Sequence, residues 1–428
     1  MKKDNWHFHT RQIHGGYSVD ETFSRGIPIH PSAAFHFGTC ERAANLFDLS
    51  EGGNIYSRLT NPTCDKYEQR VASLYRAVGA VATSSGMAAT TAAITALANA
   101  GENIVASPYL YGGTYNLFRI TLRNLGIDCR IAPSSDPKDI EALIDNQTRC
   151  VFAESMGNPT CHVIDIETYA EVAHRHQVPL IIDNTFGACG YLCNPLEWGA
   201  DIVVESATKW INGHGTGIGG IITDGGTFDW GNGKFPQIDG PSEGYHGMNL
   251  WETFGHKAYI TRIRVDMLRD LGVTASPFDA YLNMIGLETL ALRLDHEVAT
   301  AKQLAQYLQQ SPEVKRVSYV GLPDHPSHEL AKKYFRHGGG AVLNVELNGS
   351  LERTAQIVEH LKLFANMVMI GDSISVVTHP ASTTHRQLSE ADLLAAGVPP
   401  TLLRISVGLE HAEDIIADFE QAFAACKI

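Results

Sequence analysis

Two side chains with reactive potential follow short apolar runs in the middle of the chain. Asp183 ends the run that begins at Val178, and Lys209 follows the run Ile202–Glu205. Apolar runs of this length are typical of buried strands in a parallel sheet, and the carboxyl ends of such strands collect ligands at one edge. We therefore expect the carboxylate of Asp183 and the amine of Lys209 to face one cavity.

A carboxylate and a lysine amine in one cavity match the needs of pyridoxal 5′-phosphate (PLP). The carboxylate keeps the pyridine nitrogen protonated, and the amine binds the aldehyde carbon covalently. Ser206 and Thr208, at alternate positions before Lys209, could donate hydrogen bonds to a phosphate. A single Asp or Lys at the end of a strand is more commonly a turn residue or a solvated charge, so the cofactor hypothesis depends on the other elements of the sequence.

The segment Ala82–Ala89 predicts a strand, a turn of small residues and the start of an alanine-rich helix. Free backbone N–H groups at such a helix start, together with the helix dipole and Ser85, could bind an anion. Ser85 could equally be a simple helix N-cap. The sequence has no Walker motif, which argues against a nucleotide at this turn.

Three further polar or aromatic residues follow predicted strands. Tyr111 comes after the strand 103–107 and could stack on a planar ring, or could be a packing residue in a glycine turn. Glu154 and Asn158 stand at the end of the predicted strand 150–155 and in the turn that follows it. They could orient the hydroxyl side of the cofactor or only stabilise a turn.

Arg404 is a charge inside the otherwise apolar run Leu402–Val407. Burying a guanidinium without a partner costs several kcal/mol, so an anion is expected opposite it. A substrate α-carboxylate and an internal Asp or Glu are equally favoured by this pattern.

Residues 1–60 are polar, rich in glycine and poor in helical periodicity, which predicts an arm that lies on another subunit. Within this arm, Tyr56 and Arg58 could supply a phenol and a bidentate guanidinium to a phosphate. Because they lie in the arm, we expect that they could be donated across a subunit interface.

The elements that must position these residues alternate between apolar strands and helices from about residue 67. The pattern predicts an α/β domain with a mainly parallel sheet covered on both faces. Residues 225–256 interrupt it with a long loop that suggests a cover or an interface, and a helical stretch follows over 279–310. The expected divisions are the arm 1–60, a large cofactor-binding domain 61–287 and a smaller C-terminal α+β domain 288–428.

Composition excludes several classes of function. The 428 residues include 33 Lys and Arg against 47 Asp and Glu, so the net charge of −14 argues against nucleic acid or an anionic membrane as the main partner. No apolar run approaches the roughly 20 residues of a membrane span, and no signal core follows the start, which favours a cytoplasmic protein. The eight cysteines form no C-x-x-C pair and the histidines lack ligand spacing, so no metal site is expected.

Seen together, these segments resemble the Cys/Met-metabolism family of PLP-dependent enzymes, in particular the branch that acts on O-acetylhomoserine with a sulfur nucleophile. The branch assignment depends on Tyr111–Phe118 and on the insertion 225–256. The segments that carry the resemblance are Asn54–Thr63, Ser84–Ala89, Leu110–Thr114, Asp183–Thr185, Ser206–Lys209 with Asn212–Gly215, His379–His385 and Leu403–Glu410.

The resemblance implies a type I PLP-dependent fold, like that of aspartate aminotransferase, usually a tetramer of two tight dimers with shared active sites. It implies that Lys209 holds PLP covalently and, with Tyr111, moves protons, while Asp183 pairs with the pyridine nitrogen and Tyr111 stacks on the ring. The remaining implied cofactor contacts are Ser85, Gly86, Met87, Glu154, Asn158, Thr185, Ser206 and Thr208, with Tyr56 and Arg58 from a neighbour. Arg404, Tyr56, Tyr111 and Asn158 would bind substrate.

The implied reaction is γ-replacement on O-acetyl-L-homoserine by sulfide or another thiol donor, giving homocysteine and acetate in methionine biosynthesis. The sulfur could also come from a carrier protein. Two residues depart from patterns in the family: Met369 stands where relatives tend to have Ser or Asn, and Gly113 stands where methionine γ-lyases commonly carry Cys.

Other activities stay open at this point. Within the family they are cystathionine γ-synthase, O-succinylhomoserine sulfhydrylase and γ-lyase. Outside it, the glycines of Gly213–Gly220 weakly suggest a nicotinamide dehydrogenase, and a non-catalytic sulfur-carrier binding protein is a third possibility.

Overall fold

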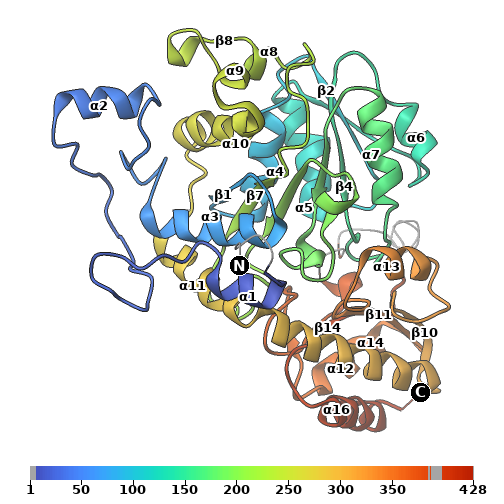
Figure 1. Ribbon diagram of the computed structural model, residues 1–428. Coiled ribbons are helices and arrows are strands. Elements are labelled where there is room, and N and C mark those ends of the chain that lie inside the picture. The colour runs from blue at the N-terminus through green and yellow to red at the C-terminus, as the bar shows by residue number, and fades with distance from the viewer. Residues whose placement is uncertain (1–5, 384–385, 387–397, 428) are drawn as a thin grey trace.

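The computed structural model describes residues 6–383, 386 and 398–427, and its centre is a seven-stranded sheet (Figure 1). In spatial order the strands are β1, β7, β6, β5, β4, β2 and β3, and within this sheet β7 alone runs antiparallel to its neighbours. The predicted mainly parallel sheet is therefore confirmed. The strands are β1 (Gly79–Thr83), β2 (Asn103–Ala106), β3 (Asp128–Ile131), β4 (Thr148–Glu154), β5 (Leu180–Asp183), β6 (Ile202–Ser206) and β7 (Gly220–Asp224).

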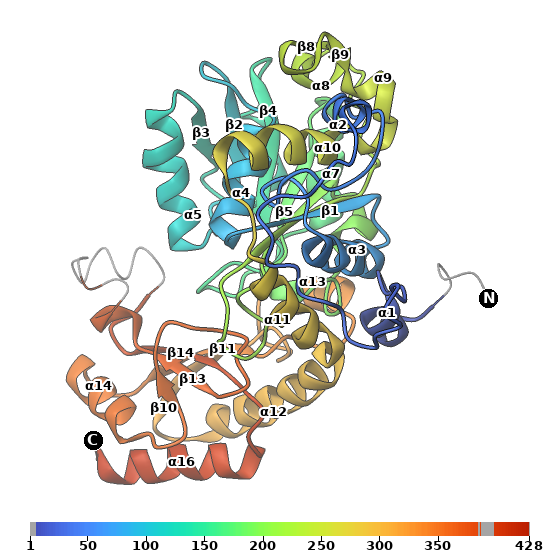
Figure 2. The same cartoon turned by 90° about the vertical axis from the view of Figure 1, so that its left-hand side faces the viewer.

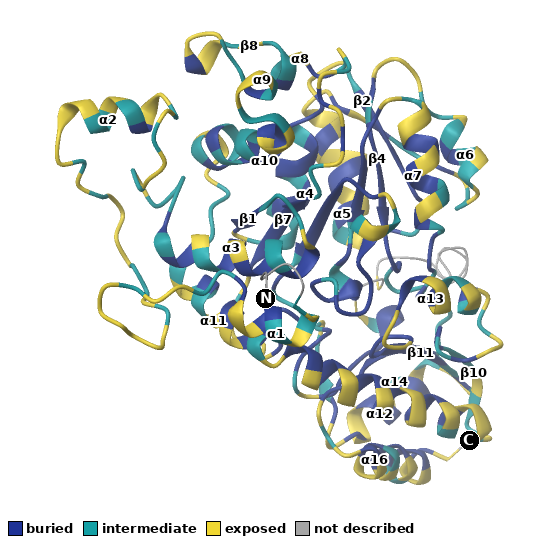
Figure 3. Ribbon diagram, viewed as in Figure 1, coloured by how far each residue is buried: buried dark blue, intermediate teal, exposed yellow. Residues whose placement is uncertain are grey.

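Helices cover both faces of this sheet because alternate strand residues point to opposite sides. On β5, Leu180 and Ile182 pack into one apolar cluster and Ile181 into the other. The first cluster includes residues of α3 (Pro62–Tyr75) and α7 (Ile166–Arg175), and the second those of α4 (Gly86–Thr95) and α10 (Ala258–Arg262). In Figure 3 the buried residues accordingly follow the central strands. The sheet edge that carries the candidate residues thus belongs to a rigid core.

A smaller C-terminal sheet lies beside the large one, as predicted. Its strand order is β10, β11, β14, β13, β12, and Arg404 lies on the central strand β14. A long helical stretch, which the sequence predicted as continuous, leads from the large domain to the small one and packs on β10, β11 and α16 at its far end. Thr289 divides it, and its hydroxyl donates to the carbonyl of Gly286, a bond that competes with the helical pattern. The elements are α11 (Pro277–Glu288), α12 (Leu290–Gln310), β10 (Val314–Ser318), α13 (His328–Tyr334), β11 (Val342–Leu347), α14 (Leu351–His360), β12 (Ala365–Asn366), β13 (Val376–Thr378), β14 (Leu402–Ser406) and α16 (Ala412–Ala425).

The N-terminal segment contains two short helices that its sequence did not suggest. The first, α1 (Phe8–His14), packs on α3 and α11 of its own chain, where Arg11 donates to the carbonyl of Leu74 at 3.0 Å. The second, α2 (Cys40–Phe47), stands apart from the large domain in Figure 1, whereas in Figure 2 it lies in front of that domain. The arm thus begins against α3 and α11, and its later residues line a cavity together with residues 244–246 and Arg269 of the same chain.

The insertion 225–256 was expected to be a loop, but it holds short elements: α8 (Pro236–Asp239), α9 (Leu250–Phe254) and a hairpin of β8 (Pro241–Ser242) with β9 (Met248–Asn249). Each is only two to five residues long, too short for a periodic pattern.

The remaining helical segments lie outside the insertion. They occupy 258–271, α5 (Gly112–Asn116) with its continuation Leu117–Leu122, and α6 (Pro137–Glu141). In the described part of the chain, no helix has the length and apolar character to cross a bilayer.

Candidate active site

A cavity of about 240 Å³ opens at the carboxyl edge of the large sheet, where the small domain faces it. Twelve of the fourteen residues predicted for the site line it; Tyr56 and Arg58 do not. The lining residues are Ser85, Gly86, Met87, Tyr111, Glu154, Met156, Asn158, Asp183, Thr185, Phe186, Ser206, Thr208, Lys209, Ile218, Val368, Met369, Ile370 and Arg404.

Asp183 stands at the end of β5 and is oriented by the residue two positions later. Its Oδ1 accepts hydrogen bonds from the backbone N–H of Thr185 at 3.0 Å and from the Thr185 hydroxyl at 2.6 Å. The same hydroxyl accepts from the backbone N–H of Ser206 at 2.9 Å, which links β5 to β6. No donor among the described residues reaches Oδ2 of Asp183, so this oxygen can pair with a protonated ring nitrogen. Burial raises the pKa of Asp183, and the two bonds from Thr185 oppose that rise.

Lys209 comes from the turn that follows β6, and its side chain is largely enclosed. Its Nζ contacts Sδ of Met369 at 3.4 Å, and no carboxylate within the described residues forms an ion pair with it. Burial first, and the charge of Arg404 second, lower the pKa of Lys209 to about 8. The uncharged, nucleophilic form of this amine is therefore more populated near neutral pH than that of an exposed lysine.

The predicted anion-binding turn precedes α4, where Ser85 is the N-cap and its role toward an anion stays a prediction. Its hydroxyl accepts from the backbone N–H of Ala88 at 3.1 Å, as an N-cap, and the residue also lines the cavity. The N–H groups of Gly86 and Met87 have no acceptor among the described residues. A Cβ at Gly86 would lie 2.7 Å from Cβ of Ser206, so glycine allows the helix start to approach β6 this closely.

Tyr111 lies at the mouth of the cavity and is 46% exposed. Its backbone N–H donates to Oε1 of Glu154, which ties the turn after β2 to the end of β4. Burial and the nearby charge of Asp183 raise the pKa of Glu154 well above its usual range. A Cβ at Gly113 would lie 2.5 Å from the ring of Tyr111, so glycine here leaves room for the aromatic side chain.

Arg404 is only 8% exposed and reaches the cavity from the small domain. It donates to Oδ1 of Asn158 at 3.1 Å, and more distantly to the carbonyl of Met369 and the hydroxyl of Thr378. Within the described residues no carboxylate pairs with it, so the internal salt bridge that the sequence allowed is absent there. A buried guanidinium with only neutral partners favours an anionic ligand.

These features fit PLP. The cavity combines a buried lysine amine of lowered pKa, a carboxylate oxygen without a donor and a helix start with free N–H groups, which correspond to the aldehyde, the ring nitrogen and the phosphate of the cofactor. Thr208 adds a hydroxyl that is held in place by Gly219, whose N–H donates to it at 3.1 Å.

Tyr56 and Arg58 lie elsewhere in the same chain. They line a separate cavity together with Tyr245 and Arg269, so the arm meets the insertion 225–256. The guanidinium of Arg58 stacks over the ring of Tyr56 at 5.3 Å and donates to the carbonyl of Arg269. Within one chain the arm residues therefore do not serve the site.

The sequence did not single out the apolar part of the site. Met156, Phe186, Ile218, Val368 and Ile370 line one side of the cavity. Ile218 and Val368 are 65% and 55% exposed, and in the sequence they are ordinary apolar residues of loops without a signal of their own. Met369 was noted only as a departure, and the structure places it between Lys209 and Arg404.

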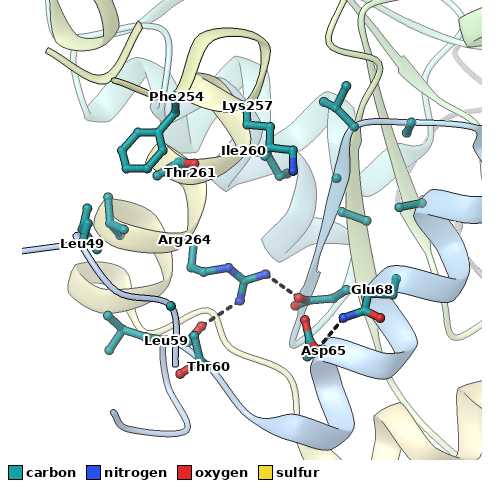
Figure 4. Close-up of a pocket in the computed structure, with 18 of the residues that line it drawn as sticks. Leu49, Leu59, Thr60, Asp65, Glu68, Phe254, Lys257, Ile260, Thr261 and Arg264 are labelled. Carbon is teal, nitrogen blue, oxygen red and sulfur yellow. Dashed lines mark hydrogen bonds and ion pairs between the residues drawn. The ribbon is translucent and has the colours of Figure 1, made fainter. Parts of the chain in front are cut away.

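A larger cavity, of about 920 Å³, lies between the arm, α3 and the segment 254–265 (Figure 4). Its polar centre is the ion pair of Arg264 with the buried Glu68. The buried nucleophile Lys209 is not among its lining residues, so size alone does not identify the active site.

Two remaining sequence features lie outside the cavity. The glycines of Gly213–Gly220 lead into β7 instead of following a strand, so the dehydrogenase pattern is not formed. In the segment His379–His385, Nε2 of His379 bonds to the carbonyl of Pro400 at 2.7 Å, and positions 384 and 385 lie outside the described residues.

Comparisons with known proteins bear on the family and the fold of the chain. Residues 9–424 match the family described as Cys/Met metabolism PLP-dependent enzyme. The chain is 49% identical to the homocysteine synthase of Schizosaccharomyces pombe, over 99% of both chains, and 47% identical to O-acetyl-L-homoserine sulfhydrylase 1 of Thermus thermophilus, over 97% of this chain and 100% of the relative. A solved structure from Campylobacter jejuni, named an O-acetylhomoserine (thiol)-lyase and carrying N′-pyridoxyl-lysine-5′-monophosphate, superposes with a TM-score of 0.94 at 36% identity, covering 98% of this chain and all of the other.

Proposed function

The chain belongs to the Cys/Met metabolism family of PLP-dependent enzymes, and from this premise we propose that it replaces the acetyloxy group of O-acetyl-L-homoserine with sulfide. The products are L-homocysteine and acetate. The observation that carries the proposal is the enclosed amine of Lys209 in one cavity with Asp183 and Arg404. The relatives named homocysteine synthase and O-acetylhomoserine sulfhydrylase support this reaction within the family.

In this proposal the cofactor is held from four directions. Lys209 would bind its aldehyde, Asp183 its ring nitrogen and Tyr111 one face of its ring. The N–H groups of Gly86 and Met87 and the hydroxyls of Ser85, Ser206 and Thr208 would surround its phosphate, while Thr185 orients Asp183 and Glu154 orients Tyr111. When bound, PLP supplies an electron-withdrawing ring that takes up the charge left when a carbon–hydrogen bond breaks.

The residues of the chain then divide the remaining work. Arg404, with Asn158 beside it, would bind the substrate α-carboxylate and so place the α-carbon near Lys209. The amine of Lys209, free once the substrate amine has taken its place at the aldehyde, would remove the α proton, and the phenol of Tyr111 would assist proton transfer at the mouth of the cavity. Burial and the charge of Arg404 lower the pKa of Lys209, which favours the uncharged, basic form of the amine.

The cavity also favours an acetyl over a succinyl leaving group. Lys209 and Arg404 are the cations that line it in the described chain, and both are committed to other roles. The carboxylate of a succinyl group would therefore find no free cation among these lining residues, whereas an acetyl group needs none.

The site would be completed by a neighbouring chain. Tyr56 and Arg58 lie outside the cavity of their own chain, so we propose that they reach the cofactor phosphate of a second subunit, within a dimer or a tetramer of two dimers. Small molecules are the expected substrates.

The direct test is to incubate the purified protein with PLP, each acylhomoserine and each sulfur donor, and to follow products by mass spectrometry. O-Acetylhomoserine with sulfide should give homocysteine and acetate faster than O-succinylhomoserine does. A preference for the succinyl ester, for cysteine as donor, or for elimination without added thiol would reject the proposal in favour of the other activities of the family.

A further inference from the structure

We propose that Arg264 is a positioning residue that fixes the N-terminal arm in the place from which Tyr56 and Arg58 reach a neighbouring chain. The inference rests on the proposed function and adds a residue outside the active-site cavity to it. Figure 4 shows the arrangement: Arg264 extends from the segment after α10 toward the arm and toward α3.

The first contact joins Arg264 to the turn that carries the two arm residues. Its Nη1 donates to the backbone carbonyl of Leu59 at 2.8 Å. Leu59 and Thr60 in turn donate their backbone N–H groups to the carbonyl of Tyr56 at 2.9 and 3.1 Å. The guanidinium therefore holds one end of a tight turn whose other end is Tyr56.

The second contact joins the same guanidinium to the core. Its Nη2 pairs with Oε2 of Glu68, a residue of α3 that is only 4% exposed. Oε1 of Glu68 accepts from the backbone N–H of Ala82 at 2.9 Å, on the strand that leads to Ser85. Burial raises the pKa of Glu68, and the charge of Arg264 opposes that rise. A buried carboxylate that loses its cation is strongly unfavourable, so Arg264 is held firmly at this end.

Other contacts near Tyr56 each join the arm to one partner: the amide of Asn61 donates to the hydroxyl of Ser57 at 2.9 Å, and the hydroxyl of Thr274 lies 3.5 Å from the carbonyl of Ser57. Arg58 donates to the carbonyl of Arg269, which lies on the same helical segment, Ile263–Leu271, as Arg264. Tyr56 itself is 42% exposed. Because one planar guanidinium spans both the arm and the core, its loss should release the arm more than the loss of any single arm contact.

Three variants separate positioning from general stability. Arg264→Lys keeps a charge for Glu68 but cannot bridge to Leu59 with the same fork of donors. Arg264→Gln removes the charge as well. Arg262→Gln is the matched control, because Arg262 is also ion-paired, to Asp266 at 2.7 Å, and donates to the carbonyls of Ala96 and Gln237, yet touches neither the arm nor Glu68.

We expect Arg264→Lys to weaken PLP binding by about tenfold, equivalent to about 1.4 kcal/mol, and Arg262→Gln to leave it within twofold. PLP binding is read from its visible absorbance, and thermal unfolding of each holoenzyme is recorded beside it. The proposal is overturned if Arg264→Lys binds PLP as tightly as the unmodified protein does, or if the control weakens binding equally.

A hybrid oligomer tests the route between chains. Chains with Lys209→Ala and Arg264→Lys, carrying one tag, are produced in excess over unmodified chains with another tag, and the mixed oligomers are isolated. In these oligomers the site with an intact Lys209 receives its arm from a chain with Arg264→Lys. That site should lose PLP faster than the same site in hybrids whose partner chain carries Lys209→Ala alone. Equal loss from the two hybrids contradicts the proposal. Absence of PLP absorbance in the unmodified protein would instead contradict the proposed function.

Discussion

The active-site cavity and the arm cavity contain residues of similar chemistry in opposite settings. In the first, Arg404 is 8% exposed and donates to Asn158; in the second, Arg58 stacks over Tyr56, which is 42% exposed, and donates to the carbonyl of Arg269. The difference teaches that the reactive groups are arranged within one chain, whereas the proposed completion of the phosphate site depends on contact between chains.

The largest effect should come from the lysine in the first cavity. Lys209→Ala should lower turnover by a factor of at least about 10³ and abolish the visible absorbance of bound PLP, because both covalent binding and proton transfer are lost. Steady-state assays and an absorbance spectrum measure this. Lys257→Ala, at an exposed lysine of the larger cavity in Figure 4, is the matched control and should behave as the unmodified enzyme does.

A smaller effect is expected from the arm. Arg58→Gln should weaken PLP binding by about tenfold, since one charge-assisted contact to phosphate is removed while Lys209 and Asp183 remain. Titration of the apoenzyme with PLP measures this. A loss as complete as that of Lys209→Ala would show that the two regions are not separable in this way, and unchanged affinity would remove the arm from the site.

The smallest effect is a shift in pH dependence within the cavity. The uncharged amine of Lys209 is the form that binds the aldehyde, so the rate of PLP attachment to the apoenzyme should rise with pH through about 8. Arg404 lowers the pKa of Lys209, so Arg404→Gln should move this midpoint to higher pH. Stopped-flow absorbance across a pH series gives both midpoints; a shift to lower pH would contradict the electrostatic link.

Much of the site could be predicted from the sequence because its residues stand at strand ends. Asp183 and Lys209 follow apolar runs, and parallel strands bring such ends to one edge. The apolar residues that line the cavity could not be predicted from the sequence. Ile218 and Val368 are loop residues, and their sequence does not indicate that the fold brings them to one cavity. The antiparallel direction of β7 and the break at Thr289 were also not visible, because apolar periodicity specifies neither strand direction nor a one-residue interruption.

The structure of the arm was also harder to predict from the sequence, because it depends on contacts between distant residues. Its glycine-rich, polar composition predicted a segment without helices, yet α1 and α2 are seven and eight residues long and depend on contacts or caps that a pattern of periodicity does not register. The contact of Arg264 with Leu59 joins residues far apart in the sequence, and only the folded chain reveals it.

The central claim is that Lys209 carries PLP with Asp183 at the ring nitrogen. The most direct measurement is reduction of the yellow holoenzyme with borohydride, followed by digestion and peptide mass spectrometry. The account predicts a single phosphopyridoxyl modification, located on Lys209, and its disappearance in Lys209→Ala. A colourless protein that gains no such modification, or a modification located on another lysine, would contradict it.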